Sequence, residues 1–187
     1  MGINTVALTH AFMARYLREG DLCIDATAGR GRDTQFLCEQ VGESGRVLAF
    51  DIQQAAVEET RARLTAAGLD ARAQVICDSH SNMARYAAPE SVRCICFNFG
   101  YLPGGDHTVY TTAETSIPAI QAGLTLLAPD GIMSLAIYYG GQTGYAERDA
   151  LLAYLQTLDD KHYTVLTSTF ANRPNDPPIP VFLWKQG

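Results

Sequence analysis

Residues 22–37 read LCIDATAGRGRDTQFL: an apolar run ending in an acid, then a glycine-bearing turn, then a segment with helical spacing. The run 22–26 is typical of a short buried strand, and the segment after the turn is typical of a helix. Gly29 and Gly31 let the backbone turn sharply and come close to a ligand, because neither carries a Cβ. The stretch therefore predicts a strand–turn–helix unit with a binding turn at its centre.

The same alternation of strand-like and helix-like segments continues along the whole chain. Such alternation indicates βαβ units and a mainly parallel sheet with helices on both faces. We predict an α/β fold with a seven-stranded sheet whose last strand is antiparallel. The expected strands are residues 22–26, 46–52, 73–78, 92–97, 132–138, 164–170 and 181–184, and the expected helices are residues 5–19, one through 36 and 37, 53–67, 116–127 and 145–158.

Length and composition favour one globular domain. The 187 residues predict a single domain over 1–187, with a helix in residues 1–20 packed on the core. Hydrophobic residues make up 47% and charged residues 18% of the chain, which excludes a disordered or fibrous protein. The formal net charge of −6 argues against a general nucleic-acid coat or a basic membrane-surface module.

Five cysteines are scattered without a disulfide-like framework, and no signal peptide or membrane-spanning apolar run is visible. These features predict a soluble cytoplasmic protein with reduced thiols and no membrane partner. Cys94 and Cys96 alternate on an apolar strand with no second pair and no nearby histidine, so we expect buried small residues and no metal site.

In an open parallel sheet, ligands bind outside the carboxyl ends of the strands. Asp25 ends the first strand, and the free N–H groups of the helix that follows the turn point toward whatever is bound there. A nicotinamide-binding turn requires a third glycine where this chain has Thr34, so an oxidoreductase is disfavoured. Asp51 lies 20 residues beyond Gly31 and ends the second strand, where a carboxylate can bind both hydroxyls of a ribose.

Two polar segments leave alternatives open. Asp51 can also cap the helix that begins at Gln53, because aspartate is favoured at that position. The run Asp78-Ser79-His80 after the third strand can address an adenine, although Asp78 alone is equally suited to capping a helix.

Asp-x-x-x-Gly-x-Gly, an acid ending the second strand and Asp-Ser after the third resemble class I S-adenosylmethionine-dependent methyltransferases. DATAGRGRDTQFL, NFGYLPGGDH and NRPNDPP resemble more closely the small rRNA methylase family, which includes tRNA methyltransferases acting on 5-aminomethyl-(2-thio)uridine at the wobble position. The resemblance implies a Rossmann-like fold and S-adenosyl-L-methionine as cofactor. The expected cofactor-binding residues are Asp25, Thr27, Gly29, Gly31, Asp33, Thr34, Asp51, Gln53, Asp78, Ser79, His80 and Asn98.

The segment Asn98-Phe99-Gly100-Tyr101 resembles the Asn/Asp-Pro-Pro-aromatic element of amino-group methyltransferases. An asparagine carbonyl can orient the amine in line with the methyl group, and Tyr101 can flank a planar base. An alkyl amine with a pKa of about 10.4 must first lose a proton. Asp106 and His107 are candidate acceptors, and a desolvated pocket is the alternative. His10 lies on the polar side of the first helix, from which it can reach the site, but we expect a solvated position.

Two positions depart from the family pattern. Gly141 stands where the family commonly has histidine, and Arg173 stands where it usually has glutamine. If these positions touch the substrate base, the substrate or the way it is held differs; if they only shape the loops, nothing changes.

We therefore predict an N-methyltransferase that acts on the wobble 5-aminomethyl-(2-thio)uridine of tRNA, with the tRNA anticodon region as partner. The alternatives are an rRNA or small-molecule methyltransferase with the same donor site and a non-catalytic RNA-binding module. The net charge of −6 suits an enzyme that takes one flipped-out nucleotide and touches few phosphates. A homodimer would supply the second charged surface that a small domain lacks.

Overall fold

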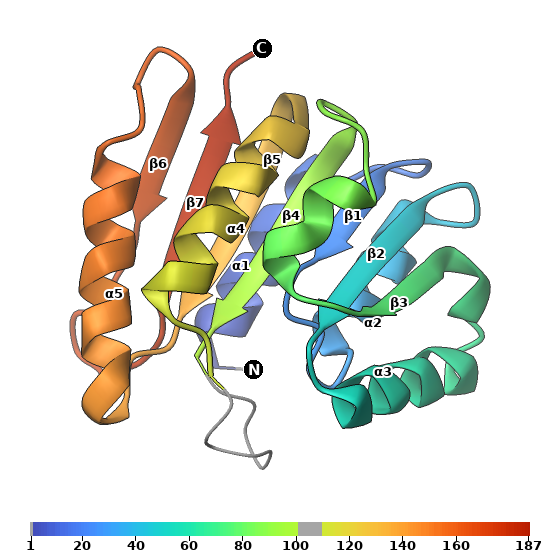
Figure 1. Cartoon of the computed structure of the whole chain (residues 1–187), viewed down its shortest axis with the longest axis horizontal. Coiled ribbons are helices and arrows are strands. Elements are labelled where there is room, and N and C mark those ends of the chain that lie inside the picture. The colour runs from blue at the N-terminus through green and yellow to red at the C-terminus, as the bar shows by residue number, and fades with distance from the viewer. Residues whose placement is uncertain (1, 101–109) are drawn as a thin grey trace.

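The computed structural model describes residues 2–100 and 110–187, apart from the side chains of 141–143 (Figure 1). Within this part of the chain, seven strands form one sheet in the order β3-β2-β1-β4-β5-β7-β6. β7 pairs antiparallel with both β5 and β6, and the other pairs are parallel, which confirms the predicted α/β fold. The strands are β1 (Leu22–Asp25), β2 (Arg46–Asp51), β3 (Ala73–Cys77), β4 (Val92–Phe99), β5 (Leu127–Ile137), β6 (Tyr163–Thr167) and β7 (Ile179–Lys185).

Helices cover both faces of the sheet, as alternation along β4 shows. Cys94 and Cys96 pack in a cluster with α1 (Thr5–Tyr16), α2 (Arg32–Val41) and α3 (Gln54–Ala66). Ile95, Phe97 and Phe99 point the other way and pack with α4 (Ala113–Leu126), α5 (Gly141–Gln156) and the 3₁₀ helix η2 (His80–Arg85). In Figure 1, α4 lies in front of the sheet and α1 behind it. A second 3₁₀ helix, η1 (Asp70–Arg72), leads into β3.

Several element boundaries differ from the sequence prediction. α1 ends at Tyr16, because Leu17 is already extended, rather than at Glu19. β4 continues to Phe99 because Asn98 and Phe99 pair with the end of β5, so Asn98 lies on the strand rather than in the loop after it. The helix η2 was not predicted, and Ser79 begins it by accepting a hydrogen bond from the backbone N–H of Ser81.

The strand order reverses at β1, which has β2 on one side and β4 on the other. The carboxyl ends of these strands bring Asp25, Asp51 and Asn98 to one edge of the sheet, which is where an open α/β sheet binds ligands. In the described residues, no helix is long and apolar enough to span a membrane. All five cysteines are free, and Cys77 is the exposed one among them.

Candidate active site

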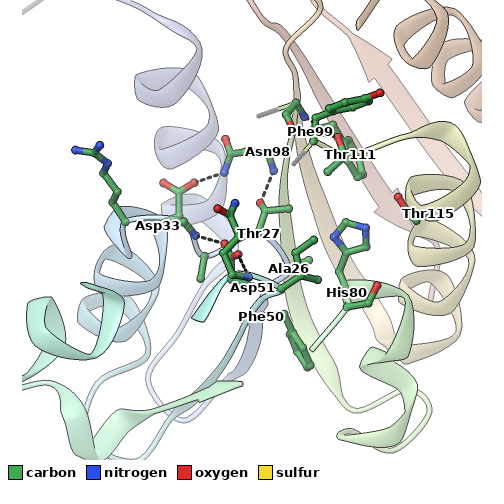
Figure 2. A pocket seen from close by; sticks show the side chains of 18 of the residues that line it. Ala26, Thr27, Asp33, Phe50, Asp51, His80, Asn98, Phe99, Thr111 and Thr115 are labelled. Carbon is green, nitrogen blue, oxygen red and sulfur yellow. Dashed lines mark hydrogen bonds between the residues drawn. The ribbon is translucent and has the colours of Figure 1, made fainter. Parts of the chain in front are cut away.

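A cavity of about 400 Å³ opens at the carboxyl ends of β1, β2, β3 and β4, within the size range of small-molecule sites (Figure 2). Most residues predicted to bind the cofactor line it, from four different strand ends: Thr27, Gly29, Asp33, Asp51, Gln53, Asp78, Ser79, His80 and Asn98. Residues of the opposite wall were not predicted; they include Gly100, Tyr110, Thr111, Thr115 and Tyr138.

Asp25 and Thr34 lie beneath the cavity lining and hold the turn together. The Asp25 carboxylate is fully buried and accepts hydrogen bonds from Thr34 Oγ1 (2.6 Å) and from the backbone N–H of Thr27 (3.2 Å). Burial, reinforced by the nearby charge of Asp33, raises the pKa of Asp25 to about 7. These two side chains bind the turn to the start of α2.

Gly31 also lies outside the set of lining residues. Its φ is +71°, and a Cβ there would lie 2.9 Å from Cγ2 and 3.0 Å from Cα of Thr60 in α3. Thr60 Oγ1 in turn donates a hydrogen bond to the backbone carbonyl of Gly29 (3.1 Å). The glycine is therefore needed for close packing between the turn and α3.

Asp51 joins the turn between β1 and α2 to the end of β2. Its carboxylate oxygens accept hydrogen bonds from the backbone N–H groups of Gly29 (2.9 Å) and Gln53 (2.9 Å). The N-cap of α3 is Gln53, so Asp51 does not occupy the capping position that was the alternative. A carboxylate has about four acceptor positions, which leaves Asp51 capacity for two ligand hydroxyls.

Asp78 organises the segment after β3. Its carboxylate accepts hydrogen bonds from Asn82 Nδ2 (2.7 Å), the Tyr86 hydroxyl (2.9 Å) and the backbone N–H of Ser79 (2.7 Å). These bonds hold the pKa of Asp78 below its usual value. The N-cap of η2 is Ser79 rather than Asp78.

His80 contributes a buried polar atom that has no partner in the described part of the chain. Its ring lies edge-on to Phe97 and Phe99, and its Nε2 makes no hydrogen bond with the described residues. Burial lowers the pKa of His80, so the neutral imidazole is favoured. A buried polar group without a partner costs free energy. A ligand in the cavity could supply that partner.

Asn98 is held by bonds from both its backbone and its side chain (Figure 2). Its backbone N–H donates to Thr27 Oγ1 (2.7 Å), and its Nδ2 donates to Asp33 Oδ2 (2.7 Å). The other oxygen of Asp33 bonds to His10 Nε2 (2.7 Å), and the His10 ring stacks on Phe36 at 3.9 Å. The expectation of a solvated His10 is therefore wrong. No spacing in the sequence indicates that α1 and α2 bring these residues together.

A buried glutamate supports the opposite wall. Thr111 Oγ1 accepts from the backbone N–H of Gly100 (2.7 Å) and donates to Glu147 Oε2 (3.0 Å). Glu147, on α5, also accepts a hydrogen bond from Ser116 Oγ (2.7 Å), and burial raises its pKa. The two ends of the segment 100–111 are thus tied to each other and to α5.

The remaining predicted residues fall elsewhere. Tyr101, Asp106 and His107 lie outside the described residues, and their roles stay predictions. Gly141 begins α5. Arg173 donates a hydrogen bond to the backbone carbonyl of Ile3 and lies over the ring of Phe170.

A family model described as "Putative rRNA methylase" matches residues 47–184. The chain belongs to this family. A curated relative from Arabidopsis thaliana, a chloroplastic tRNA (mnm5s2U34)-methyltransferase, is 34% identical over 191 residues, which cover 96% of this chain and 68% of the relative.

Two solved structures extend the similarity to three dimensions. A "putative rRNA-methylase" from Clostridium thermocellum is 41% identical, with a TM-score of 0.96 over 99% of both chains. A "putative methyltransferase" from Streptococcus mutans, in complex with SAH, is 34% identical, with a TM-score of 0.89 over 99% of both chains. SAH is the product that remains when S-adenosylmethionine gives up its methyl group. The present chain is an S-adenosylmethionine-dependent methyltransferase.

The cavity of this methyltransferase fits such a cofactor. Asp51 retains acceptor capacity for ribose hydroxyls, and the start of α2, where Gly31 makes no side-chain capping bond, suits a carboxylate. The Nε2 of His80, which has no partner among the described residues, offers a polar contact in an otherwise aromatic corner. The lining therefore combines an apolar slot with a few polar groups, as nucleoside sites require.

Proposed function

We propose that this methyltransferase methylates the exocyclic amine of 5-aminomethyl-(2-thio)uridine at the wobble position of tRNA. The single observation that carries the proposal is the fixed amide of Asn98 at the cavity wall. Its nitrogen is bonded to Asp33, so its oxygen is the atom available to a substrate N–H. The name of the Arabidopsis relative, whose similarity spans almost the whole chain, supports the choice of acceptor.

On the donor side, we propose that Thr27, Gly29, Asp51, Gln53, Asp78, Ser79 and His80 hold S-adenosyl-L-methionine. When bound, this cofactor would supply an electrophilic methyl group on a sulfonium, which the lone pair of a neutral amine can accept as the sulfur–methyl bond breaks and S-adenosylhomocysteine leaves. The chain's own part is to fix the two reactants in a near-attack arrangement, and such positioning accounts for a large share of the barrier reduction in two-substrate reactions.

On the acceptor side, the amine must be neutral when it reacts, so it must either bind in the neutral form or lose a proton in the site. An alkyl amine with a pKa of about 10.4 is mostly protonated at neutral pH. A desolvated cavity disfavours the charged form, and Asp106 and His107 remain the predicted proton acceptors. Burial raises the pKa of Tyr138, so its hydroxyl stays protonated beside the cavity. We propose that desolvation of the amine, or proton transfer to Asp106 or His107, releases this proton before methyl transfer.

The partner we propose is an RNA, with the tRNA anticodon region presenting a single flipped-out nucleotide. A net charge of −6 fits an enzyme that binds few phosphates. A homodimer is part of this proposal, because a second copy would extend the surface available to the RNA.

The test is methyl transfer to tRNA that lacks the terminal wobble methylation, read by nucleoside mass spectrometry. We expect the wild-type enzyme to form the methylaminomethyl product. We expect Asn98→Ala to lower kcat by about 10²- to 10³-fold, as loss of a catalytic hydrogen-bonding group does. The affinity of this variant for S-adenosylhomocysteine should stay within about threefold of wild type, because the proposed donor contacts remain.

Two results would count against the proposal. Inactivity on this tRNA, combined with methylation of rRNA or a free amine, would replace the acceptor while keeping the donor site. Full turnover by Asn98→Ala would remove the assigned role of Asn98.

A further inference from the structure

Asp33 accepts one short side-chain hydrogen bond on each of its two carboxylate oxygens. His10 Nε2, from α1, lies 2.7 Å from Oδ1, and Asn98 Nδ2, from β4, lies 2.7 Å from Oδ2. The three residues come from three separate elements, with sequence separations of 23 and 65 residues. Their meeting at the cavity wall is therefore a product of the fold rather than of local sequence.

We infer that Asp33 and His10 are positioning residues that lock the side-chain amide of Asn98 with its oxygen turned away from Asp33 and toward the substrate. This inference rests on the proposed function of Asn98. It concerns how that side chain is held.

The orientation of the Asn98 amide follows from donor and acceptor chemistry. An ionised carboxylate has no hydrogen to donate, so only the NH₂ end of Asn98 can face Asp33. A flipped amide would place Oδ1 of Asn98 against Oδ2 of Asp33, two acceptors at a distance of 2.7 Å. The bond from the Asn98 backbone N–H to Thr27 Oγ1 (2.7 Å) fixes the other end of the residue.

The charge on Asp33 is maintained by its surroundings. Burial alone would raise the pKa of Asp33, but the hydrogen bonds from His10 and Asn98 outweigh it and hold the pKa below its usual value. Asp33 also lies in the first turn of α2, where the helix dipole favours a negative charge. The carboxylate is thus an acceptor throughout the neutral range.

His10 restrains the carboxylate itself. Its side chain is 25% exposed, and its ring lies 3.9 Å from that of Phe36, with an angle of 9° between the ring planes. Stacking of this kind limits rotation of the imidazole, so the bond to Asp33 Oδ1 has a fixed direction. With Oδ1 held by His10, Oδ2 is the atom left for Asn98.

The consequence for the substrate is a preference for an acceptor nitrogen that carries hydrogen. The free atom of a locked Asn98 is a hydrogen-bond acceptor, which suits an amino group. A ring nitrogen that presents only a lone pair would meet the lone pairs of that oxygen. The locked amide thus deepens the proposed function by selecting amines among possible acceptors.

The decisive variant is Asp33→Asn, which keeps the size of the side chain but can present either an oxygen or an NH₂ to Asn98. We expect kcat to fall about 10- to 100-fold, because misalignment of the Asn98 amide and the acceptor amine lowers the rate by factors of this size. The Kd for S-adenosylhomocysteine should change less than about threefold. His10→Gln should give a smaller loss in the same direction.

The matched control is Asp21→Asn, because Asp21 accepts a hydrogen bond from the backbone N–H of Arg18 (2.7 Å) outside the cavity lining. We expect this control to leave kcat unchanged. The readout independent of turnover is the Asn98 side-chain amide in nitrogen-15 NMR spectra. In wild type its two hydrogens should exchange slowly with solvent, and in Asp33→Asn this protection should be lost.

Two outcomes would overturn the inference. Equal losses of turnover and of S-adenosylhomocysteine affinity in Asp33→Asn would make Asp33 a direct donor ligand. An Asn98 amide unchanged by the substitution would show that Asp33 does not hold it. If wild-type enzyme does not methylate tRNA, the proposed function fails, and the NMR signal still decides whether Asp33 locks Asn98.

Discussion

Two aspartates eight positions apart behave in opposite ways at the heart of the site. Asp25 is sealed in the core and its pKa is raised, whereas Asp33 receives two side-chain hydrogen bonds and its pKa is lowered. At neutral pH the negative charge is therefore concentrated on Asp33, next to Asn98. The same residue type serves as a core group that is about half protonated near pH 7 and as a fixed anion within one strand–turn–helix unit.

The raised pKa of Asp25 predicts a pH-dependent stability. The folded state holds the proton of Asp25 more tightly than the unfolded state. The contribution of this group to stability is therefore fully present below pH 3.8 and is lost as the pH rises toward about 7. A shift from 3.8 to about 7 corresponds to at most roughly 4 kcal/mol. In Asp25→Asn this contribution should vanish, because the amide does not titrate.

The measurement is urea unfolding of both proteins between pH 4 and pH 7.5. The wild-type free energy of unfolding should decline relative to that of Asp25→Asn across this range, and taking the difference removes the other titrating groups. Parallel curves for the two proteins would contradict the prediction.

At the residue scale, sequence reasoning predicted polar residues that line the cavity, because these residues follow strands. Asp51, Asp78 and Asn98 each stand at or just after a strand end, and the alternation of elements places all strand ends at one edge. His10 was misjudged because its partner Asp33 comes from another element. The spacing of residues within one helix does not indicate which residues of another helix it contacts.

Among the elements, the contact between α3 and the turn that joins β1 to α2 offers a test of the packing. Gly31 and Gly68 have nearly the same φ, +71° and +68°. A Cβ on Gly31 would strike the Cα of Thr60 at 3.0 Å, whereas a Cβ on Gly68 would meet nothing within 4 Å. Comparison of the two positions therefore separates the cost of backbone strain from the cost of a steric collision between elements.

Alanine at the two positions should therefore have unequal effects. Gly68→Ala should cost about 1 kcal/mol, the strain of a left-handed conformation. Gly31→Ala should cost about 1–3 kcal/mol more, because α3 must move. Thermal and urea unfolding of the two variants check this prediction, and equal losses would show that α3 yields without cost.

The elements themselves were predictable where their patterns were long. Apolar runs and helical spacing gave all seven strands and the five α-helices, with ends displaced by a few residues. The helix η2 lacked such a pattern because it is short and polar, and it depends on the bonds that Asp78 and Ser79 make. The hydrogen bond from Thr111 to Glu147 joins residues that are distant in the sequence, so no local pattern predicts it.

For the whole molecule, the charge balance predicts how RNA binding depends on salt. Twenty acids outnumber fourteen lysines and arginines, so few phosphates can be held at once. With about three phosphate contacts, the logarithm of the tRNA association constant should fall with a slope of about −2 against the logarithm of salt concentration. Binding measured at several salt concentrations tests this, and a slope steeper than about −5 would indicate an extended RNA-binding surface.

The distribution of thiols has a practical consequence. Four cysteines are buried, and burial raises the pKa of Cys38, Cys94 and Cys96, which keeps them unreactive in the folded protein. Cys77 is exposed and directly precedes Asp78 at the cavity. Cys77 is thus an attachment point for a maleimide dye, placed where fluorescence can follow cofactor binding without a change of sequence.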